Sequence, residues 1–450
     1  MNNLTSQQRK LVYLVCIVVL LIPIIWLSLP SDGDKGAGGV LSQLRTEYEL
    51  GETDLGNVDA SSAAMNLVLL GMRGVAVNML WIELDTQKDM KRWAEMQATT
   101  ESIVRLQPHF QKVWDFNGHN LAYNTSAEWD AVPDRYYWVK QGAKFLQRGV
   151  ERNRRSTELY YLTGKILQHK IGFADESVDY RKYFINDPDP AFKGGSDPVI
   201  NRDGRDNFLV AKDWYEDATT REAAHAQHIL DRSLFLAHPA RCQFDYAQAM
   251  QKDGRFGEAT RAAWEQARKD WIEGFGRKQI HADMGPTDKS EIMLEMTDEE
   301  IARIASTEEE QTRVRRAVDQ YQKMTNYRYW RMRAFSEAEP ETAEAHRSLF
   351  EAKQAYKAVE FNKAEAAAFK GMEGFDKLLK QDEYKLLTDE EMLCEECLLG
   401  WKIWDDIHQV SGKKMPADFP LKWLVEMKYG NEQLMGNVNK QFRRLFMETR

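Results

Sequence analysis

The chain has 450 residues, of which 43% are hydrophobic and 29% charged, a composition typical of a folded protein. Its formal net charge of −9 argues against a nucleic-acid partner, because binding to phosphate requires a cationic face. Four cysteines are too few for a disulfide-stapled secreted scaffold, so the core must hold itself together by packing. Proline is scarce and few segments alternate polar and apolar residues as strands do, so we expect an all-α protein.

An uncharged stretch begins at Leu11 and ends at Pro30. At about 1.5 Å per helical residue it can cross a hydrocarbon core of roughly 30 Å, which predicts a transmembrane anchor at 11–30. The alternative is a cleaved signal peptide, but the run is longer than a usual signal core and no small-x-small cleavage site follows it. Arg9 and Lys10 precede the run, and positive charge stays on the cytoplasmic side. We therefore expect a bacterial inner-membrane protein with a cytoplasmic tail at 1–10 and a periplasmic C-terminal domain.

A second apolar stretch, at 63–84, bears on this topology, because a second span would return the large domain to the cytoplasm. Arg73 near its middle would cost roughly 2.5–3.5 kcal/mol in a bilayer. Ser61 and Ser62 offer an N-cap, which favours a buried or interfacial helix of the soluble part. A second membrane segment remains the alternative.

The rest of the chain divides by composition. Residues 31–60 are rich in Gly and Asp and are expected to be a tether, and 61–275 an N-terminal helical domain. A connector at 276–307, C-terminal helical hairpins at 308–430 and a tail at 431–450 follow, with one long charged helix expected at 308–334. The segment 172–205 is dense in Asp, Asn, Gly and Pro, and we expect an ordered loop that packs through Tyr180, Tyr183 and Phe184.

Part of the helical region repeats with an offset of 46 residues. Val104 matches Val150, Trp114 matches Tyr160, and Gly118 matches Gly164. In each unit an aromatic residue stands four positions before a glycine, which places both on one helix face and lets a neighbouring helix approach. Helical hairpins are also expected around turns at 253–259 and 360–364, where small residues recur every four or seven positions.

These helix pairs resemble tetratricopeptide repeats. From GMRGVAVNMLWIELD through DNFLVAKDWYEDA and DGRFGEATRAAWEQA to the hairpin at 361–379, most of the chain is similar to a family of bacterial membrane-anchored proteins with such repeats. The offset of 46 residues in place of 34, and Arg154 where the consensus has proline, are departures. The resemblance implies a TPR-like array of α-helical hairpins, a degenerate α-solenoid.

The pair Cys394 and Cys397 forms a CxxC motif. A redox CxxC opens a helix, where the helix dipole stabilises a thiolate. Here Thr388 to Glu391 predicts a capping box, which would place both cysteines inside a helix among acids that raise the thiol pKa. A zinc site would need a second pair, and none exists. We interpret them as ordinary helical cysteines.

Three other patterns resemble metal or phosphate sites, but we do not predict such a site at any of them. The spacing of Glu222, His225 and His228, with 405–408 as a loose second match, lacks the further glutamates of a di-iron site. The acidic segments at 187–189 and 201–206 could coordinate calcium, but they lack the spaced ligands of an EF-hand. The glycines at 194–195 lack the lysine of a phosphate loop.

The sequence therefore names no catalytic, cofactor-binding or metal residue and predicts no cofactor. The expected function is that of a membrane-tethered scaffold or assembly subunit that acts by protein–protein contact, through groove-lining aromatics and the charged helix at 308–334. One alternative is an all-α enzyme, which clustered carboxylates of raised pKa in a deep pocket would reveal. The other is a subunit of a membrane transporter or envelope complex, which an exposed apolar patch on the 63–84 helix would favour.

Overall fold

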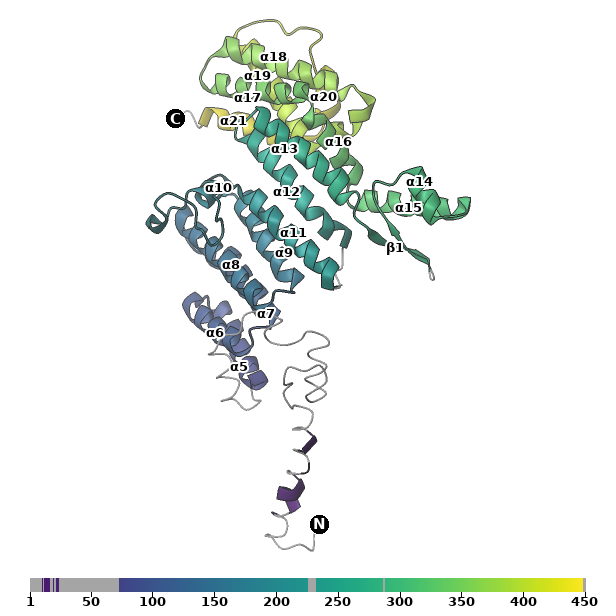
Figure 1. Cartoon of the computed structure of the whole chain (residues 1–450). Helices are drawn as coiled ribbons and strands as arrows, with labels where there is room; N and C mark the ends of the chain where they lie inside the picture. The colour runs from purple at the N-terminus through teal and green to yellow at the C-terminus, as the bar shows by residue number, and fades with distance from the viewer. Residues whose placement is uncertain are drawn as a thin grey trace. The chain divides into compact units, whose positions relative to one another are not determined.

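A computed structural model describes residues 10, 12–16, 19, 22–23, 73–225, 232–285 and 288–447 (Figure 1). The described residues between 10 and 23 are helical, while the remainder of the predicted anchor, the tether at 31–60 and the capping serines at 61–62 lie outside them. Within the described part, no helix is long and apolar enough to cross a membrane.

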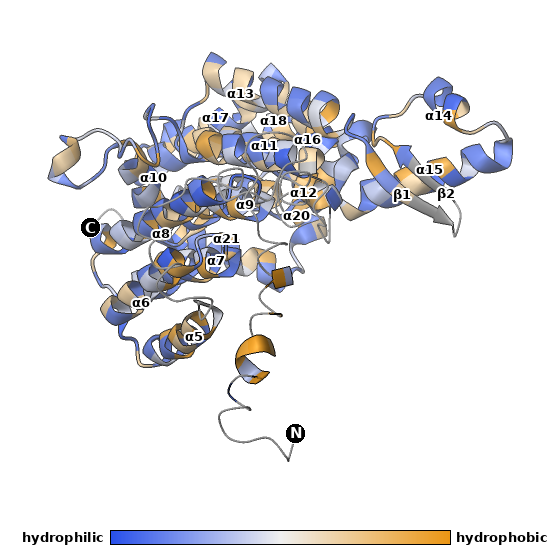
Figure 2. Ribbon diagram, turned by 60° about the horizontal axis from the view of Figure 1, so that its bottom comes forward, coloured by the Kyte–Doolittle hydropathy of each residue, from blue (hydrophilic) through white to orange (hydrophobic). Residues whose placement is uncertain are grey.

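Every regular element of the described part is helical apart from one two-stranded hairpin, which confirms the all-α fold class. The helices carry both hydrophobic and hydrophilic residues along their length (Figure 2), as expected for amphipathic helices that bury one face. The chain forms two compact units, one of residues 1–202 and 220–225 and the other of 203–219 and 226–450. Helix α11, Asn207–His225, contributes to both units.

The first unit is built from helices of 9 to 21 residues. In chain order they are α5 Arg73–Asp89, α6 Trp93–Leu106, α7 Gln111–His119, α8 Val132–Arg152, α9 Thr157–Lys165 and α10 Ser177–Ile185. The stretch at 63–84 thus enters the described part as α5, whose Arg73 side chain is outside the description.

The 46-residue offset read from the sequence recurs in the element bounds. Helices α7 and α9 begin at Gln111 and Thr157, and each runs into a π-helical segment, Asn120–Thr125 and Ile166–Ile171 respectively. In the first copy the glycine face allows close packing, as expected. A Cβ on Gly118 would lie 2.6 Å from Cγ of Leu146 on α8, which is closer than two carbon atoms can approach.

The segment at 172–205 is ordered, as predicted, but it is more helical than expected. It contains α10 and a 3₁₀ turn at Pro190–Phe192. Tyr180 and Phe184 of α10 are fully buried, and Tyr183 contacts the ring of Tyr136 on α8. The expected aromatic anchors therefore hold this segment against the unit.

The second unit contains the two hairpins predicted at 253–259 and 360–364. Its elements are α12 Arg232–Lys252, α13 Glu258–Lys269, β1 Ile280–Gly285, β2 Asp288–Ile292, α14 Asp298–Ile304, α15 Glu308–Met324, α16 Tyr327–Ala338, α17 Pro340–Lys357, α18 Phe361–Leu379, α19 Glu391–Val410, α20 Lys422–Lys428 and α21 Glu432–Met447. The segment at 431–450, expected as a tail, holds α21, which packs Leu434 and Val438 into the core formed with α17, α18 and α19.

The segment expected as a connector, 276–307, contains the antiparallel hairpin β1–β2. Two other local expectations for this unit were wrong. The long helix expected at 308–334 breaks between α15 and α16, because Asn326 adopts a left-handed conformation with φ of 54° and Tyr327 stacks on Trp271. Helix α19 is capped by Glu390, whose carboxylate accepts a hydrogen bond from the amide of Leu393, and not by the predicted box at Thr388.

Candidate functional site

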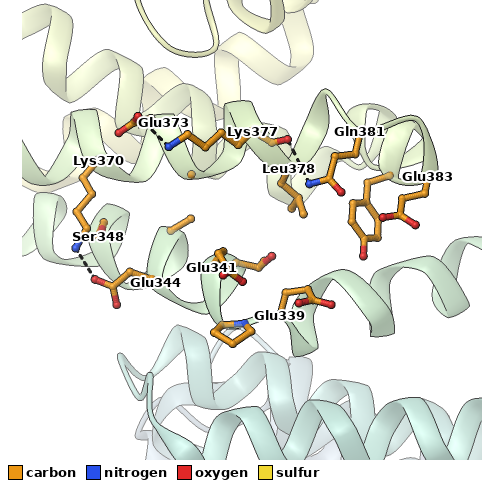
Figure 3. Close-up of a pocket in the computed structure, with 15 residues that line it drawn as sticks. Glu339, Glu341, Glu344, Ser348, Lys370, Glu373, Lys377, Leu378, Gln381 and Glu383 are labelled. Carbon is orange, nitrogen blue, oxygen red and sulfur yellow. Dashed lines mark hydrogen bonds and ion pairs between the residues drawn. The ribbon is translucent and has the colours of Figure 1, made fainter.

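A groove of about 620 Å³ lies in the second unit beside helices α17 and α18 (Figure 3). The first half of α17 and the second half of α18 line it, together with the start of the 3₁₀ helix Asp382–Asp389. Acidic side chains dominate the lining, with only Lys370 and Lys377 as cations. The acids are Glu339, Glu341, Glu344, Glu373 and Glu383.

The two lysines neutralise only part of this charge. Lys370 donates to Glu344 at 2.6 Å, and Lys377 pairs with Glu373 at 3.0 Å. The hydrogen bond from Lys370 lowers the pKa of Glu344, so that carboxylate is ionised at neutral pH. The other three glutamates, at 339, 341 and 383, form no ion pair with any described residue, and all are exposed. The groove therefore presents uncompensated negative charge to solvent.

Glycines bring α17 and α18 into close contact next to the groove. A Cβ on Gly371 would lie 2.6 Å from Cγ of Leu349, and one on Gly374 would lie 2.7 Å from Cβ of Ala345. Small residues at these positions let two helix backbones approach, as the sequence pattern predicted for this hairpin. The groove thus has a rigid floor made by two helices packed at short distance.

A buried ion network crosses the same unit close by. The ring of His346 on α17 lies between two carboxylates, with Nδ1 2.9 Å from Oε2 of Glu396 on α19 and Nε2 3.1 Å from Oε2 of Glu337 on α16. Glu337 also accepts a hydrogen bond of 2.9 Å from Gln251 on α12. Arg333 of α16 adds a contact of 3.2 Å to Glu390. The network ties four helices together.

The charge of this network follows from its pKa values. Burial favours a neutral imidazole, but Glu396 and Glu337 outweigh it and raise the pKa of His346 to about 10. Burial likewise opposes ionisation of Glu337, yet His346 and Arg333 lower its pKa to about 2. His346 is therefore an imidazolium at neutral pH. Sequence reasoning missed it, since its partners are nine and fifty residues away and no short motif marks them.

The first unit holds its own buried ion pairs. Lys140 of α8, whose side chain is 3% exposed, lies 2.8 Å from Asp187 and 3.4 Å from Asp197. Lys144, one turn further, lies 2.5 Å from Asp197. Both aspartates belong to the 172–205 segment, so these lysines fix it to α8. Asp187, weighed above as a calcium ligand, has a lysine as its partner.

The structure does not bring the other candidates together. Asp406 accepts a hydrogen bond from the Tyr356 hydroxyl at 2.5 Å, and His408 lies 3.0 Å from the carbonyl of Trp404. The side chains of His225 and His228 lie outside the described residues. Among the residues that are described, no group of three or more His, Cys, Asp or Glu is placed to hold a metal ion.

The two cysteines of the CxxC motif are free and buried in the first turns of α19. Burial raises the pKa of Cys394 to about 11 and raises that of Cys397 well above its ordinary value, so both are thiols at neutral pH. The direction matches the expectation, but burial is the larger cause and neighbouring acids the smaller one. A protonated thiol is a poor nucleophile, so neither cysteine is activated in the way that a redox CxxC requires.

The sign that would mark an enzyme was a cluster of carboxylates with raised pKa in a deep pocket. Burial raises the pKa of Glu216 on α11, but this residue is not among those that line the groove. Within the groove the pKa of Glu344 is lowered. The described part therefore offers no observation in favour of the enzyme alternative.

No family model, no curated protein and no solved structure matches this chain. The resemblance to membrane-anchored TPR-like proteins accordingly stays a prediction, and the function must be argued from the site.

The ion network predicts how stability depends on pH. Folding raises the pKa of His346 from the usual 6.5 to about 10. Its ion pairs therefore contribute stability that is complete below pH 6.5 and is lost as pH rises towards 10. The lowered pKa of Glu337 gives stability that is complete above about pH 4.5 and lost as pH falls towards 2. Replacing His346→Gln should therefore cost most between pH 4.5 and 6.5, by about 3–5 kcal/mol. The cost should shrink steadily as pH rises to 10.

Urea unfolding of the full chain in detergent, at pH values from 5 to 10, measures this difference. The matched control is His281→Gln on β1, where the imidazole is 66% exposed and its loss should change little at any pH. A cost of His346→Gln that stays constant across this range would show that the buried ring is neutral.

Proposed function

We propose that this chain is a membrane-tethered, TPR-like helical scaffold that binds other proteins, and that the groove beside α17 and α18 holds a basic segment of a partner. One observation carries the proposal: a rigid groove of about 620 Å³ in which three of five glutamates have no ion-pair partner in the described chain. Arrays of helix pairs commonly present such grooves and need no catalytic group to use them.

Charge defines the partner's chemistry. Lysines of the groove engage Glu344 and Glu373 and leave Glu339, Glu341 and Glu383 for a ligand. A segment with several Lys or Arg side chains would complete these pairs, and opposite charge also accelerates encounter. The apolar part of the lining, with Leu378 and Tyr384, gives the stems of such side chains a surface to cover.

The predicted anchor at 11–30 would confine the groove to the membrane surface. A tether at 31–60 would hold the groove near the membrane and raise its effective concentration for membrane partners. In this proposal the groove works in the periplasm at the inner membrane, with the tail at 1–10 in the cytoplasm.

A crosslinking experiment tests the groove. A photo-reactive residue in place of Gln381, which lines the groove, should give a discrete crosslinked adduct in cells. The same residue in place of the exposed Lys385, in the 3₁₀ helix that follows Gln381, should give none. Combining the first with Glu339→Gln, Glu341→Gln and Glu383→Gln should lower the adduct yield on the order of ten-fold, because the charge attraction is removed.

The matched control for charge replaces three exposed acids outside the groove, Glu351→Gln, Asp418→Asn and Glu432→Gln, and should leave the yield unchanged. Equal loss with both triple variants, or an equal adduct from position 385, would remove the groove from the proposal.

Protease protection tests the topology. A C-terminal tag on the full chain, expressed in a bacterium, should be digested when protease is added to spheroplasts and protected in inverted inner-membrane vesicles. This follows from Arg9 and Lys10 staying on the cytoplasmic side. The opposite pattern would place the large domain in the cytoplasm and require a second span at 63–84.

A second candidate function, a subunit of a membrane assembly, is favoured by the surface of α5. Val75, Met79 and Ile82 are 46%, 67% and 69% exposed. Their spacing places them on one face of α5, where they form an apolar stripe. An exposed stripe on this helix was the sign expected of a subunit that packs against partner helices.

The stripe predicts the size of the complex in mild detergent. Replacing Met79→Ser with Ile82→Ser should shift the chain from a larger species to a smaller one in native electrophoresis, because the apolar contact is lost. Val178→Ser with Val199→Ser removes two comparably exposed side chains of the same unit and should leave the size unchanged. If neither pair alters the size, α5 is not a subunit contact.

A further inference from the structure

A cavity of about 280 Å³ lies in the second unit, among α12, α16, α17, α19 and the turn at Phe256. This volume is close to the lower end of the range for small-molecule pockets, so the cavity suits a small metabolite and not a peptide. Its lining residues differ from those of the α17–α18 groove, so it is a separate site.

The ion network forms one wall of this cavity and settles the state of its carboxylates. Glu396 is held by His346 at 2.9 Å, and Arg333 and His346 hold Glu390 and Glu337 at 3.2 and 3.1 Å. Each acid of the network thus contacts a cation within the protein, with the imidazolium of His346 shared by Glu337 and Glu396. A ligand cation would have to compete with an imidazolium or a guanidinium that is already in place.

Two further side chains of the lining, Lys353 and Gln248, supply hydrogen-bond donors. Lys353 of α17 forms no ion pair within 4 Å with a described residue, and its charge acts on Glu396 only at longer range. The side-chain nitrogen Nε2 of Gln248 on α12 is buried and has no hydrogen-bond partner in the described chain. An unmet buried donor is costly, which makes an acceptor in this cavity favourable.

The other side of the cavity is apolar. The rings of Phe256 and Phe350 lie 5.5 Å apart with their planes tilted by 59°, and Met392 adds a polarisable thioether side chain. Such surfaces pack against an aromatic or aliphatic body. Cavities with an apolar wall and a few convergent polar groups are the usual form of small-molecule sites.

We propose that this cavity binds a small monocarboxylate with an aromatic or aliphatic body. The carboxylate accepts from Gln248 Nε2 and pairs with the ammonium of Lys353, while the body packs against Phe256, Phe350 and Met392. A second carboxylate is disfavoured, since the ionised Glu396 shares the wall.

Binding of 4-fluorophenylacetate, followed by fluorine NMR on the full chain in detergent, tests the proposal. The expected result is saturable binding at about 1 mM or tighter. Its neutral amide, 4-fluorophenylacetamide, and the cationic 4-fluorophenethylamine should each bind at least ten times more weakly, because they lack the charge that Lys353 recognises. Equal binding of the acid and the amide, or no saturation by the acid, would overturn the proposal.

Two variants locate the site. Lys353→Met and Gln248→Leu should each weaken binding of the acid at least ten-fold, whereas Lys440→Met, at an exposed lysine of α21, should leave it unchanged. Circular dichroism of each variant checks that the helices persist. Unchanged binding in both cavity variants would place the acid elsewhere and overturn the assignment, with no consequence for the groove, whose test uses position 381.

Discussion

The imidazolium of His346, held between Glu337 and Glu396, sets the position of α17 relative to α16 and α19. Removing ionised groups from water costs several kcal/mol each, and this cost is offset only while the partners stay within contact distance. A small shift of any of these helices would leave a charge unpaired in the interior. The network therefore selects one arrangement, and both the groove and the cavity depend on it because α17 lines each of them.

The first unit uses the same physics to fix an irregular segment. Its loop at 186–205 has few helical hydrogen bonds of its own, and buried loops are costly unless their polar groups find partners. Asp187 and Asp197 meet Lys140 in the interior, with side chains no more than 3% exposed. Aromatic burial by Tyr180 and Phe184 alone would hold α10 but would not fix the loop that follows it. In both units, buried ion pairs fix the positions of segments that helix packing alone does not fix.

Most features that depend on neighbours in sequence were predicted correctly, with the capping box at Thr388 as an exception, whereas most features that depend on distant contacts were not. The pattern of Trp114 and Gly118 is local, so the 46-residue offset and the helices that carry it follow from the sequence. The break at Asn326 has no proline or glycine to mark it, and it depends on Tyr327 stacking on Trp271, 56 residues earlier. The network of Glu337, His346 and Glu396 could not be predicted for the same reason. Taken alone, each of these residues looks in the sequence like a solvated residue of a helix.

Helix α17 shows how one amphipathic element serves two recognition surfaces. At about 100° per residue, Glu341, Ala345 and Ser348 fall on one face, and His346, Phe350 and Lys353 fall on a face turned by more than a third of a circle. The first face lines the acidic groove and the second lines the cavity with its cations. Both faces belong to one helix, so the ion pairs that hold His346 in place also fix the position of α17 beside the groove.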